Sequence, residues 1–331
     1  MIITLDAMGG DNAPAAAVHG AVWAARDFGV TIQLVGQPEA IETELAKHNT
    51  SGLSLPILPA SEVIEMDESP AKAVKSKKDS SMVVGLRCLK AGECDAFVSA
   101  GNSGGVLAAA LFGLGRIKGI KRPALSTVFP NNSEYGHCFL LDVGANTDVR
   151  PEFLVQFALM GSLYAEKVMG IPTPRVGLLS TGEEDDKGSQ LVQETSPLLR
   201  ATHLNFMGNV EGKDIPTGIV DVIVTDGFTG NVYIKGVEGA AVLILKVLKQ
   251  EIKSRPLAWV GAGLAWGALK ALRKKLDYRE FGGGPLLGVN GTVIIAHGRS
   301  DAYAIRHAIR VAKQASENQI VQAIENGLAD L

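Results

Sequence analysis

The sequence predicts an α/β protein with a mostly parallel sheet, and three observations support this prediction. Short β-branched runs alternate with longer helical patterns along the 331 residues, each run ends in a turn of Gly, Asn, Asp or Ser, and Gly is abundant, at 38 residues. This alternation is typical of strand–helix units joined into a parallel sheet. We expect a single domain over residues 1–331, with two lobes as the alternative.

The first strand–turn–helix unit begins the chain. Residues 2–6 have the pattern of a buried strand that ends on an acid, and residues 7–14 form a glycine turn that opens toward a helix starting near Ala15. Glycine lets backbone N–H groups turn inward without steric cost, and the N-terminus of a helix favours anions. This loop therefore suits an anionic ligand.

The same arrangement recurs five more times along the chain. The later turns are residues 100–105, 142–146, 180–185, 225–231 and 297–301. Ligands of open parallel sheets bind outside the carboxyl ends of the strands. We therefore expect all six loops to gather at one edge of the sheet and to form a site for a small, oxygen-rich ligand.

Longer helical patterns follow these turns. They fit residues 15–28, 38–48, 79–91, 103–116, 151–169, 187–200, 229–253 and 300–327. The last of them has apolar residues at helical spacing and charged residues on its other faces, so we expect it to pack on the sheet.

The composition excludes several classes of protein. Hydrophobic residues make up 46% of the chain and charged residues 20%, which is typical of globular and not of disordered proteins. The balance of 32 basic against 35 acidic residues provides no basic field, so we expect no nucleic-acid partner. Cys88, Cys94 and Cys138 have neither CxxC nor metal-ligand spacing, which fits a reduced cytosol. We expect a cytoplasmic protein, because the chain starts with a strand and no uncharged apolar stretch reaches the ~20 residues needed to span a membrane.

One segment, residues 246–278, breaks the compact pattern, and we call it the apolar hairpin. Its centre, residues 257–269, carries no charge and contains two tryptophans, while basic residues flank it on both sides. Pro256 separates this centre from the preceding helix, so we expect a protruding helical hairpin. Its candidate contact residues are Leu257, Trp259, Val260, Leu264, Trp266, Lys270, Arg273 and Lys274.

Three uses of the apolar hairpin stay open at this point. Apolar helical stripes usually pack in a protein's own core or across a dimer interface. A run that is too short to span a membrane, contains Trp and is flanked by cations also suits the surface of an anionic membrane. The same basic residues suit an acidic protein partner.

Several nucleotide and metal motifs do not occur in the sequence. Gly9-Gly10 is not part of a GxGxxG fingerprint, and no GxxxxGK[ST], HExxH or EF-hand loop is present. The sequence therefore implies no dinucleotide, no P-loop nucleotide, no metal and no other cofactor.

One loop satisfies the GxSxG pattern of serine esterases. Residues 101–105 follow a strand and open a helix, which is the context of a nucleophile elbow at Ser103, and Asp226 and His297 follow in the chain order of a hydrolase. The alternative is that Ser103 caps a helix within an anion cradle. His297 is then either structural or a catalytic or phosphate-contacting residue. Lys78, in a basic cluster that enters a helix, is either solvated or an anion ligand.

Six motifs occur in a characteristic order along essentially the whole chain. They are residues 6–11, 78–82, 99–104, 142–146, 225–231 and 288–291. The ordered set resembles the bacterial phosphate acyltransferases of the PlsX family. The chain departs from the family at two places: Arg299 follows His297-Gly298, where members usually carry a small residue, and Ser189 follows Lys187-Gly188, where they usually carry Asn or Asp.

The resemblance implies an enzyme with an open three-layer α/β/α fold, related to isopropylmalate dehydrogenases and phosphotransacetylases. It implies that the enzyme converts a long-chain acyl-carrier-protein (acyl-ACP) thioester and inorganic phosphate into acyl phosphate and free ACP. It also implies a homodimer, peripheral association with the inner face of the cell membrane, and a membrane acyltransferase that passes the acyl group to glycerol 3-phosphate, early in phospholipid synthesis. The rivals are a phosphotransacetylase-like enzyme that uses acyl-CoA, a serine esterase at Ser103, and a non-enzymatic membrane scaffold.

The residues of the polar loops suit this chemistry, and we assign roles to them on that basis. Phosphate is the nucleophile, so the protein must hold it beside the thioester and stabilise the oxyanion that forms. Backbone N–H groups of residues 101–104 and 227–230 then form the phosphate cradle, His297 contacts phosphate or the oxyanion, and Asp226 orients a partner. The candidate phosphate-binding residues are Gly101, Asn102, Ser103, Gly104, Asn146, Asn231 and Lys78.

Overall fold

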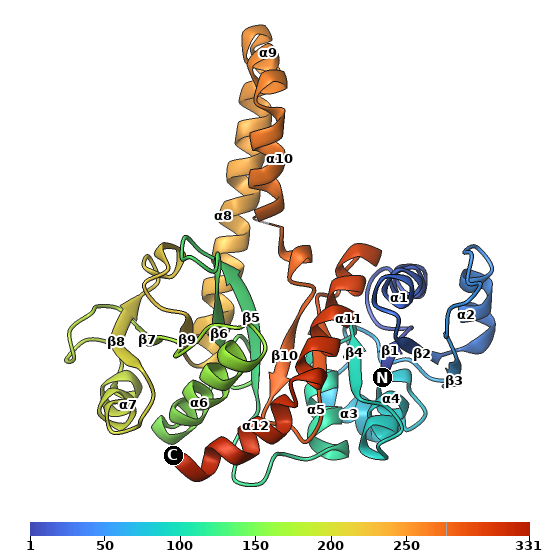
Figure 1. The fold of residues 1–331 in the computed structure, drawn as a ribbon, viewed down its shortest axis with the longest axis horizontal. Helices are drawn as coiled ribbons and strands as arrows, with labels where there is room; N and C mark the ends of the chain where they lie inside the picture. The colour runs from blue at the N-terminus through green and yellow to red at the C-terminus, as the bar shows by residue number, and fades with distance from the viewer. Residues whose placement is uncertain (276) are drawn as a thin grey trace.

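The computed structural model describes residues 1–275 and 277–331, apart from the side chains of residues 273, 278 and 330. Its centre is one 11-stranded sheet in the order β3-β2-β1-β4-β11-β10-β5-β6-β9-β7-β8 (Figure 1). The strands are β1 (Ile2–Asp6), β2 (Thr31–Gly36), β3 (Ile57–Pro59), β4 (Ala96–Ser99), β5 (Ala124–Pro130), β6 (His137–Leu141), β7 (Val176–Ser180), β8 (Phe206–Glu211), β9 (Val222–Val224), β10 (Gly283–Leu287) and β11 (Val293–Ala296).

Helices cover both faces of this sheet, which confirms the predicted three-layer α/β/α arrangement. The helices are α1 (Ala15–Phe28), α2 (Pro38–Leu45), α3 (Pro70–Ser76), α4 (Ser81–Lys90), α5 (Ser103–Gly113), α6 (Pro151–Lys167), α7 (Gln190–Arg200), α8 (Gly227–Ser254), α9 (Pro256–Leu264), α10 (Trp266–Lys275), α11 (Ala302–Glu317) and α12 (Ile320–Gly327).

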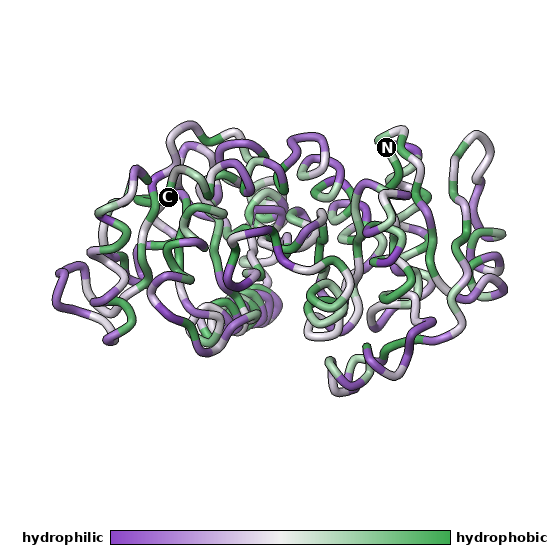
Figure 2. Tube along the Cα trace, turned by 90° about the horizontal axis from the view of Figure 1, so that it is seen from below, coloured by the Kyte–Doolittle hydropathy of each residue, from purple (hydrophilic) through white to green (hydrophobic). Residues whose placement is uncertain are grey.

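The core lies in layers on either side of the strands. Buried residues of α1 and α11 pack with Leu5 and Val98 on one face, while α4 and α5 pack with Phe97 on the other. The first and last parts of the chain meet where α1 crosses α11, because a Cβ at Gly20 would lie 2.6 Å from the Cβ of Ile305. Apolar segments run through the interior of both halves of the molecule (Figure 2).

Three successive antiparallel pairings divide the sheet into two halves. β11 pairs antiparallel with β10, β10 with β5, and β5 with β6, whereas the strands on either side of this group pair in parallel. Three reversals leave β6, β9 and β7 running opposite to β1, β4 and β11. The carboxyl ends of these two sets of strands therefore lie at opposite ends of the sheet, which we call the Asp142 end and the His297 end.

The prediction that six polar loops gather at one edge is therefore wrong. Residues 7–14, 100–105 and 297–301 lie at the His297 end, whereas residues 142–146, 180–185 and 225–231 lie at the Asp142 end. The sequence of a short strand does not reveal its direction in the sheet. In a mixed sheet, strands that run in opposite directions have their carboxyl ends at opposite ends of the sheet.

Helix α8 connects the two ends of the sheet. It begins at the Asp142 end, directly after β9, and by Glu238 it has reached the loop after β11, where Arg299 Nη2 lies 3.4 Å from Glu238 Oε2. The rest of α8 continues beyond the sheet at the His297 end, α9 lies at the tip of this projection, and α10 returns from the tip toward the body (Figure 1).

The apolar hairpin is built differently from the helices of the body. Only Gly227 and Gly230 of α8 are buried, and α9 has no buried residue. The uncharged run forms two helices, α9 and α10, which meet at Ala265. Within the described residues no helix combines the length and the apolar character that crossing a membrane requires.

One predicted helix is divided in the structure. The helix expected over residues 300–327 is two helices, α11 and α12, because Gln319 between them takes a left-handed conformation with φ of 49°. α11 packs on the sheet as expected, while Ile320 and Ile324 of α12 join the core cluster of α6.

Candidate active site

A buried carboxylate ties together two loops at the His297 end. Asp6, the last residue of β1, is 2% exposed and accepts hydrogen bonds from Ser99 Oγ (2.7 Å) and from the N–H of Met8 (3.2 Å). Ser99 Oγ in turn accepts the N–H of Gly101 (3.0 Å). Burial raises the pKa of Asp6, and hydrogen bonds from Ser81, Ser99 and the backbone oppose that shift. The N–H of Gly101, predicted to contact phosphate, is thus used to hold its own loop.

The third loop of this end packs backbone to backbone on the first. Gly10 has a φ of 101°, and a Cβ at this position would lie 2.9 Å from the carbonyl oxygen of Gly298. The N–H of Asp11 donates to that same carbonyl (2.8 Å), and Asn12 Nδ2 donates to the carbonyls of the two residues after Gly298 (3.3 and 3.2 Å). The loops after β1, β4 and β11 therefore form one connected unit.

The side chain of Asn102 is occupied by structural hydrogen bonds. Its Oδ1 caps α5 by accepting the N–H of Gly105 (3.0 Å), and its Nδ2 donates to the carbonyls of Glu65, Met66 and Glu68 (3.2, 3.1 and 3.0 Å). Asn102 was predicted as a phosphate-binding residue. In this structure it instead anchors the 65–68 loop beside the start of α5.

The first turn of α5 keeps two backbone donors for a ligand. Ser103 and Gly104 begin this helix, while the N–H groups of Gly105 and Val106 are bound by Asn102. First-turn N–H groups have no partner within their own helix, and the helix dipole favours an anion beside them. The side chain of Ser103 is exposed at this point. Of the phosphate cradle predicted at residues 101–104, these two N–H groups are the part that the fold leaves to a ligand.

His297 is an exposed side chain in the loop after β11. Its Nδ1 accepts the N–H of Arg299 (3.4 Å), so the neutral ring carries its proton on Nε2. Desolvation lowers the pKa of His297, the positive charges of Arg299 and Lys235 lower it further, and Glu238 and Asp11 oppose the shift. The ring is therefore neutral near pH 7 and presents a hydrogen-bond donor.

Helix α8 contributes two residues that sequence reasoning missed. Lys235 and Glu238 lie three positions apart on one face of α8, and their charges act on His297. Glu238 also pairs with Arg299 at 3.4 Å. Arg299, one of the positions where the chain departs from the PlsX pattern, thus both lowers the pKa of His297 and joins its loop to α8. The i, i+3 spacing of Lys235 and Glu238 was the available signal in the sequence.

The loop after β6 is organised around a second buried carboxylate. Asp142 is 0% exposed and accepts the N–H groups of Gly144, Ala145 and Asn146 (3.0, 2.9 and 2.8 Å). Burial raises the pKa of Asp142, and these donors oppose the shift. Asn146 Nδ2 donates to Asp142 (2.8 Å) and to the carbonyl of Pro123 (2.7 Å). Asn146 is thus engaged in holding its loop to the start of β5.

The two remaining candidates of the Asp142 end also hold local structure. Asn231 Nδ2 donates to the carbonyl of Val143 (2.9 Å), and Asp226 caps α8 by accepting the N–H and hydroxyl of Thr229 (2.8 and 2.6 Å). Twelve residues of α8 separate Asp226 from Glu238, or about 18 Å of helix. The structure does not bring Asp226, Asn146 or Asn231 to the His297 end, and the cradles at 101–104 and 227–230 are separate.

Lys78 lies at the His297 end but is held on its own segment. Its exposed side chain donates from Nζ to the carbonyl of Val74 (3.4 Å), and Arg87 Nη2 donates to the Lys78 carbonyl (2.9 Å). Ser81, three residues later, hydrogen-bonds to Asp6, which places this segment beside the tied loops.

The candidate contact residues of the apolar hairpin are strongly exposed. Leu257 and Leu264 are each 88% exposed, Val260 and Trp266 are each 66% exposed, and Trp259 is 59% exposed. Lys270 and Lys274 are exposed in α10, and Lys274 Nζ lies 4.0 Å from Glu280. The side chain of Arg273, also predicted as a contact, lies outside the described part of the structure.

Comparison with known sequences identifies a family over almost the whole chain. The sequence profile of the family described as fatty acid synthesis protein matches residues 1–323. A phosphate acyltransferase of Endomicrobium trichonymphae is 49% identical over 332 residues, covering 99% of this chain and 98% of the relative. A phosphate acyltransferase of Heliobacterium modesticaldum is 52% identical over 326 residues, covering 98% and 97%.

Comparison with solved structures supports the fold. A phosphotransacetylase from Streptococcus pyogenes superposes with a TM-score of 0.62 at 18% identity, covering 98% of this chain and 94% of that one. The EutD phosphotransacetylase from Staphylococcus aureus gives a TM-score of 0.59 at 17% identity, with the same coverage. At this identity the likeness establishes the three-layer architecture alone.

The charges around His297 predict opposite effects of two substitutions. Arg299→Ala removes a cation that lowers the pKa of His297, so we expect that pKa to rise, whereas Glu238→Gln removes an opposing anion and should lower it further. The measurement is a titration of the His297 ring followed by NMR in both variants and the wild type. An identical ring pKa in all three proteins would contradict the placement of these side chains.

Proposed function

Because the chain belongs to the fatty acid synthesis protein family and is a phosphate acyltransferase, we propose that it transfers a long-chain acyl group from acyl-ACP to inorganic phosphate. The products are acyl phosphate and free ACP. The observation that carries this proposal lies at the His297 end, where the loop that carries His297 adjoins the loop that presents the N–H groups of Ser103 and Gly104.

The proposed chemistry needs no covalent enzyme intermediate. An oxygen of phosphate attacks the thioester carbonyl carbon, and the carbonyl electron pair moves onto oxygen to give a tetrahedral oxyanion. When this intermediate collapses, the new C–O bond stays, the C–S bond breaks, and the sulfur of ACP takes up the proton that phosphate loses. The protein has to align the two reactants and stabilise the oxyanion.

The His297 end offers groups for both tasks. The N–H groups of Ser103 and Gly104, with the positive end of the α5 dipole, suit the phosphate dianion. His297 offers its Nε2–H to the oxyanion, while its other ring nitrogen, Nδ1, accepts the N–H of Arg299. Asp6 and Asn102 act as positioning residues, because they hold the loops that carry these donors.

The serine-esterase alternative finds less support in the same geometry. A hydrolase needs an unprotonated His nitrogen that faces Ser103 and a carboxylate behind the ring. Here His297 Nδ1 accepts the N–H of Arg299, which leaves Nε2 protonated, and Asp226 caps α8 at the opposite end of the sheet. The acyl-CoA alternative differs from the proposal only in the acyl donor. The two are distinguished by whether the enzyme prefers acyl-CoA or acyl-ACP.

We further propose that the apolar hairpin docks on the inner face of the cell membrane. Its exposed Leu and Val side chains suit the acyl boundary, its tryptophans suit the headgroup level, and Lys270 and Lys274 suit anionic lipids or the acidic ACP. The projection leaves the body at the same end as His297. A long acyl chain then passes between lipid and reaction centre without crossing the protein, and a membrane acyltransferase that acylates glycerol 3-phosphate would receive the acyl phosphate.

We also propose that the protein is a homodimer. Val242, Leu243 and Ile244 of α8 are 62%, 60% and 65% exposed, and they follow one another on the part of the helix that lies beyond the sheet. Three consecutive apolar residues span about 200° of the circumference of a helix, so a single flat lipid surface leaves part of this apolar stretch uncovered. A second copy of this chain, packed against this part of α8, would bury it.

The proposed reaction predicts a phosphate-dependent product. Purified protein incubated with palmitoyl-ACP and phosphate should give hydroxamate after trapping with hydroxylamine, together with free ACP thiol. His297→Ala should lower kcat by about 10²–10³-fold, the usual cost of losing one oxyanion donor. Release of fatty acid without phosphate, with fluorophosphonate labelling of Ser103, would instead establish the esterase, and turnover of acyl-CoA alone would establish the phosphotransacetylase branch.

The membrane proposal predicts a selective loss of lipid binding. The triple variant Leu257→Ser/Val260→Ser/Leu264→Ser should no longer co-sediment with vesicles that contain phosphatidylglycerol, because it removes the most exposed apolar side chains of the hairpin tip. The matched control is Met207→Ser/Ile219→Ser, which replaces side chains that are 54% and 46% exposed on the body and should leave sedimentation unchanged. Equal sedimentation of the triple variant and the wild type would reject the proposal.

A further inference from the structure

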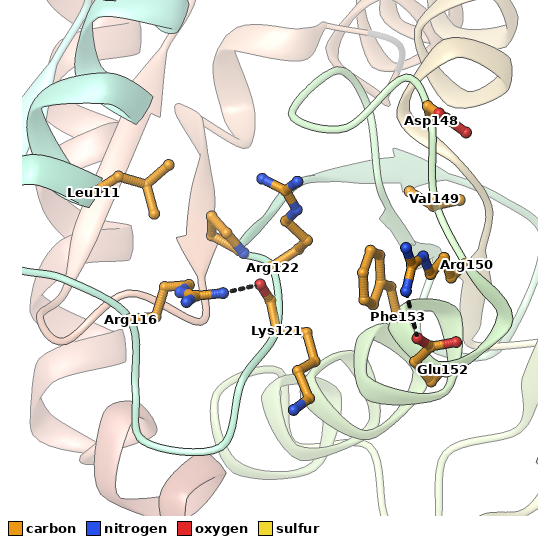
Figure 3. Close-up of a pocket in the computed structure, with 10 residues that line it drawn as sticks. Leu111, Arg116, Lys121, Arg122, Asp148, Val149, Arg150, Glu152 and Phe153 are labelled. Carbon is orange, nitrogen blue, oxygen red and sulfur yellow. Dashed lines mark hydrogen bonds and ion pairs between the residues drawn. The ribbon is translucent and has the colours of Figure 1, made fainter.

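A large cavity lies at the Asp142 end, away from the proposed reaction centre. It has a volume of about 790 Å³ and lies between the segment that leads into β5 and the start of α6 (Figure 3). This size is within the range of ligand-binding pockets. The residues around it come from two separate stretches of the chain, 111–123 and 148–153, so the sequence alone gives no sign of it.

The lining of this cavity is rich in cations. The lining includes four cations, Arg116, Lys121, Arg122 and Arg150, and two acids, Asp148 and Glu152. This leaves two positive charges in excess within a chain whose formal net charge is −3.

Two of the four cations are available to a ligand. The Arg116 guanidinium donates to the backbone carbonyl of Lys121, and Arg150 Nη1 is 4.0 Å from Glu152 Oε1. Among the residues that the structure describes, the side chains of Lys121 and Arg122 have neither a hydrogen-bond nor an ion-pair partner. An ammonium and a guanidinium without partners beside a cavity are the donor set that phosphate groups prefer.

The start of α6 adds to the positive potential of the cavity. α6 has 17 residues, with Arg150 at its N-cap position and Pro151 as its first residue, and Glu152 and Phe153 of its first turn line the cavity. The positive end of the dipole of this helix therefore acts on the same space as the cations. The negative charge of Glu152 opposes this field. That charge is itself partly balanced by Arg150, whose Nη1 lies 4.0 Å from Glu152 Oε1.

The remaining wall of the cavity is apolar. Leu111, Val149 and Phe153 are partly buried and line the cavity beside the cations. Inorganic phosphate alone would leave this wall in contact with water. Lys121 and Arg122 point to opposite sides of their segment, so each can meet a phosphate at a different part of the cavity (Figure 3). An organic molecule that carries a phosphate group would use both parts of the lining, with its phosphate on one of these cations and its organic part on the apolar wall.

We propose that this cavity is a second anion site, which binds an organic phosphate of up to nucleotide size at a distance from the reaction centre. Two sources supply such a ligand: a nucleotide, or a phosphopantetheine arm of the kind found in coenzyme A. Both carry a phosphate and, elsewhere in the same molecule, an apolar or aromatic group, which is the combination that the lining suits. None of the lining residues belongs to the His297 end, so a ligand bound there does not occupy the proposed phosphate position at the start of α5.

Isothermal titration of the full-length protein tests this proposal. AMP and 4′-phosphopantetheine are the two probes, and pantetheine, which lacks phosphate, is their control. We expect at least one of the phosphorylated probes to bind, and pantetheine not to bind. The tighter of the two identifies the source of the ligand.

Variants of the lining then locate the binding. Lys121→Gln/Arg122→Gln should weaken the Kd of the phosphorylated probe by about tenfold or more, because the charge-assisted contact to the phosphate is lost whichever of the two side chains makes it. The matched control is Lys118→Gln, an exposed lysine of the same segment that does not line the cavity, and it should leave the Kd unchanged. His297→Ala should also leave it unchanged, which separates this site from the reaction centre. Absence of binding by both phosphorylated probes, equal binding of pantetheine, or an unchanged Kd in the double variant would each overturn the proposal.

Discussion

Three successive antiparallel pairings in the middle of the sheet determine where every polar loop of this chain lies. Because β11, β10, β5 and β6 alternate in direction, the loops after β1, β4 and β11 share one end and those after β6, β9 and β7 share the other. The sheet therefore has polar loops at both of its ends, whereas the sequence predicted them at one. α8 is the element that bridges them, since it starts beside Asp142 and places Lys235 and Glu238 beside His297.

The donors at the His297 end are held by interactions that leave little freedom. Asp6 is buried, and the chain of hydrogen bonds from Gly101 to Ser99 to Asp6 joins strand and loop within the core. Gly10 allows backbones to approach so closely that even one added carbon would collide with the Gly298 carbonyl. Such preorganisation suits a reaction in which the protein forms no bond to the substrate, because aligned donors then supply most of the stabilisation.

Local patterns in the sequence predicted local structure well. The strand–turn–helix units, the three layers and the family all follow from short motifs whose chemistry is contained in a few neighbouring residues. The direction of strands of three to seven residues is not contained there, and the single-edge site failed for that reason. Asn102 was misinterpreted for a related reason. The hydrogen-bond acceptors of its side chain lie 34 to 37 residues away in the sequence, so nothing near Asn102 indicates that this side chain is already engaged. The roles of Lys235 and of the basic cavity depend on packing between distant segments, which a single sequence does not record.

The central claim of this account is that phosphate binds at the His297 end and not in the glycine loop that begins α8. Crystals soaked with thiophosphate would test it directly, because the anomalous scattering of sulfur marks the position of the bound anion. The account predicts a peak within hydrogen-bonding distance of the N–H groups of Ser103 and Gly104, beside the ring of His297. A peak at residues 227–230, with none at the start of α5, would contradict it.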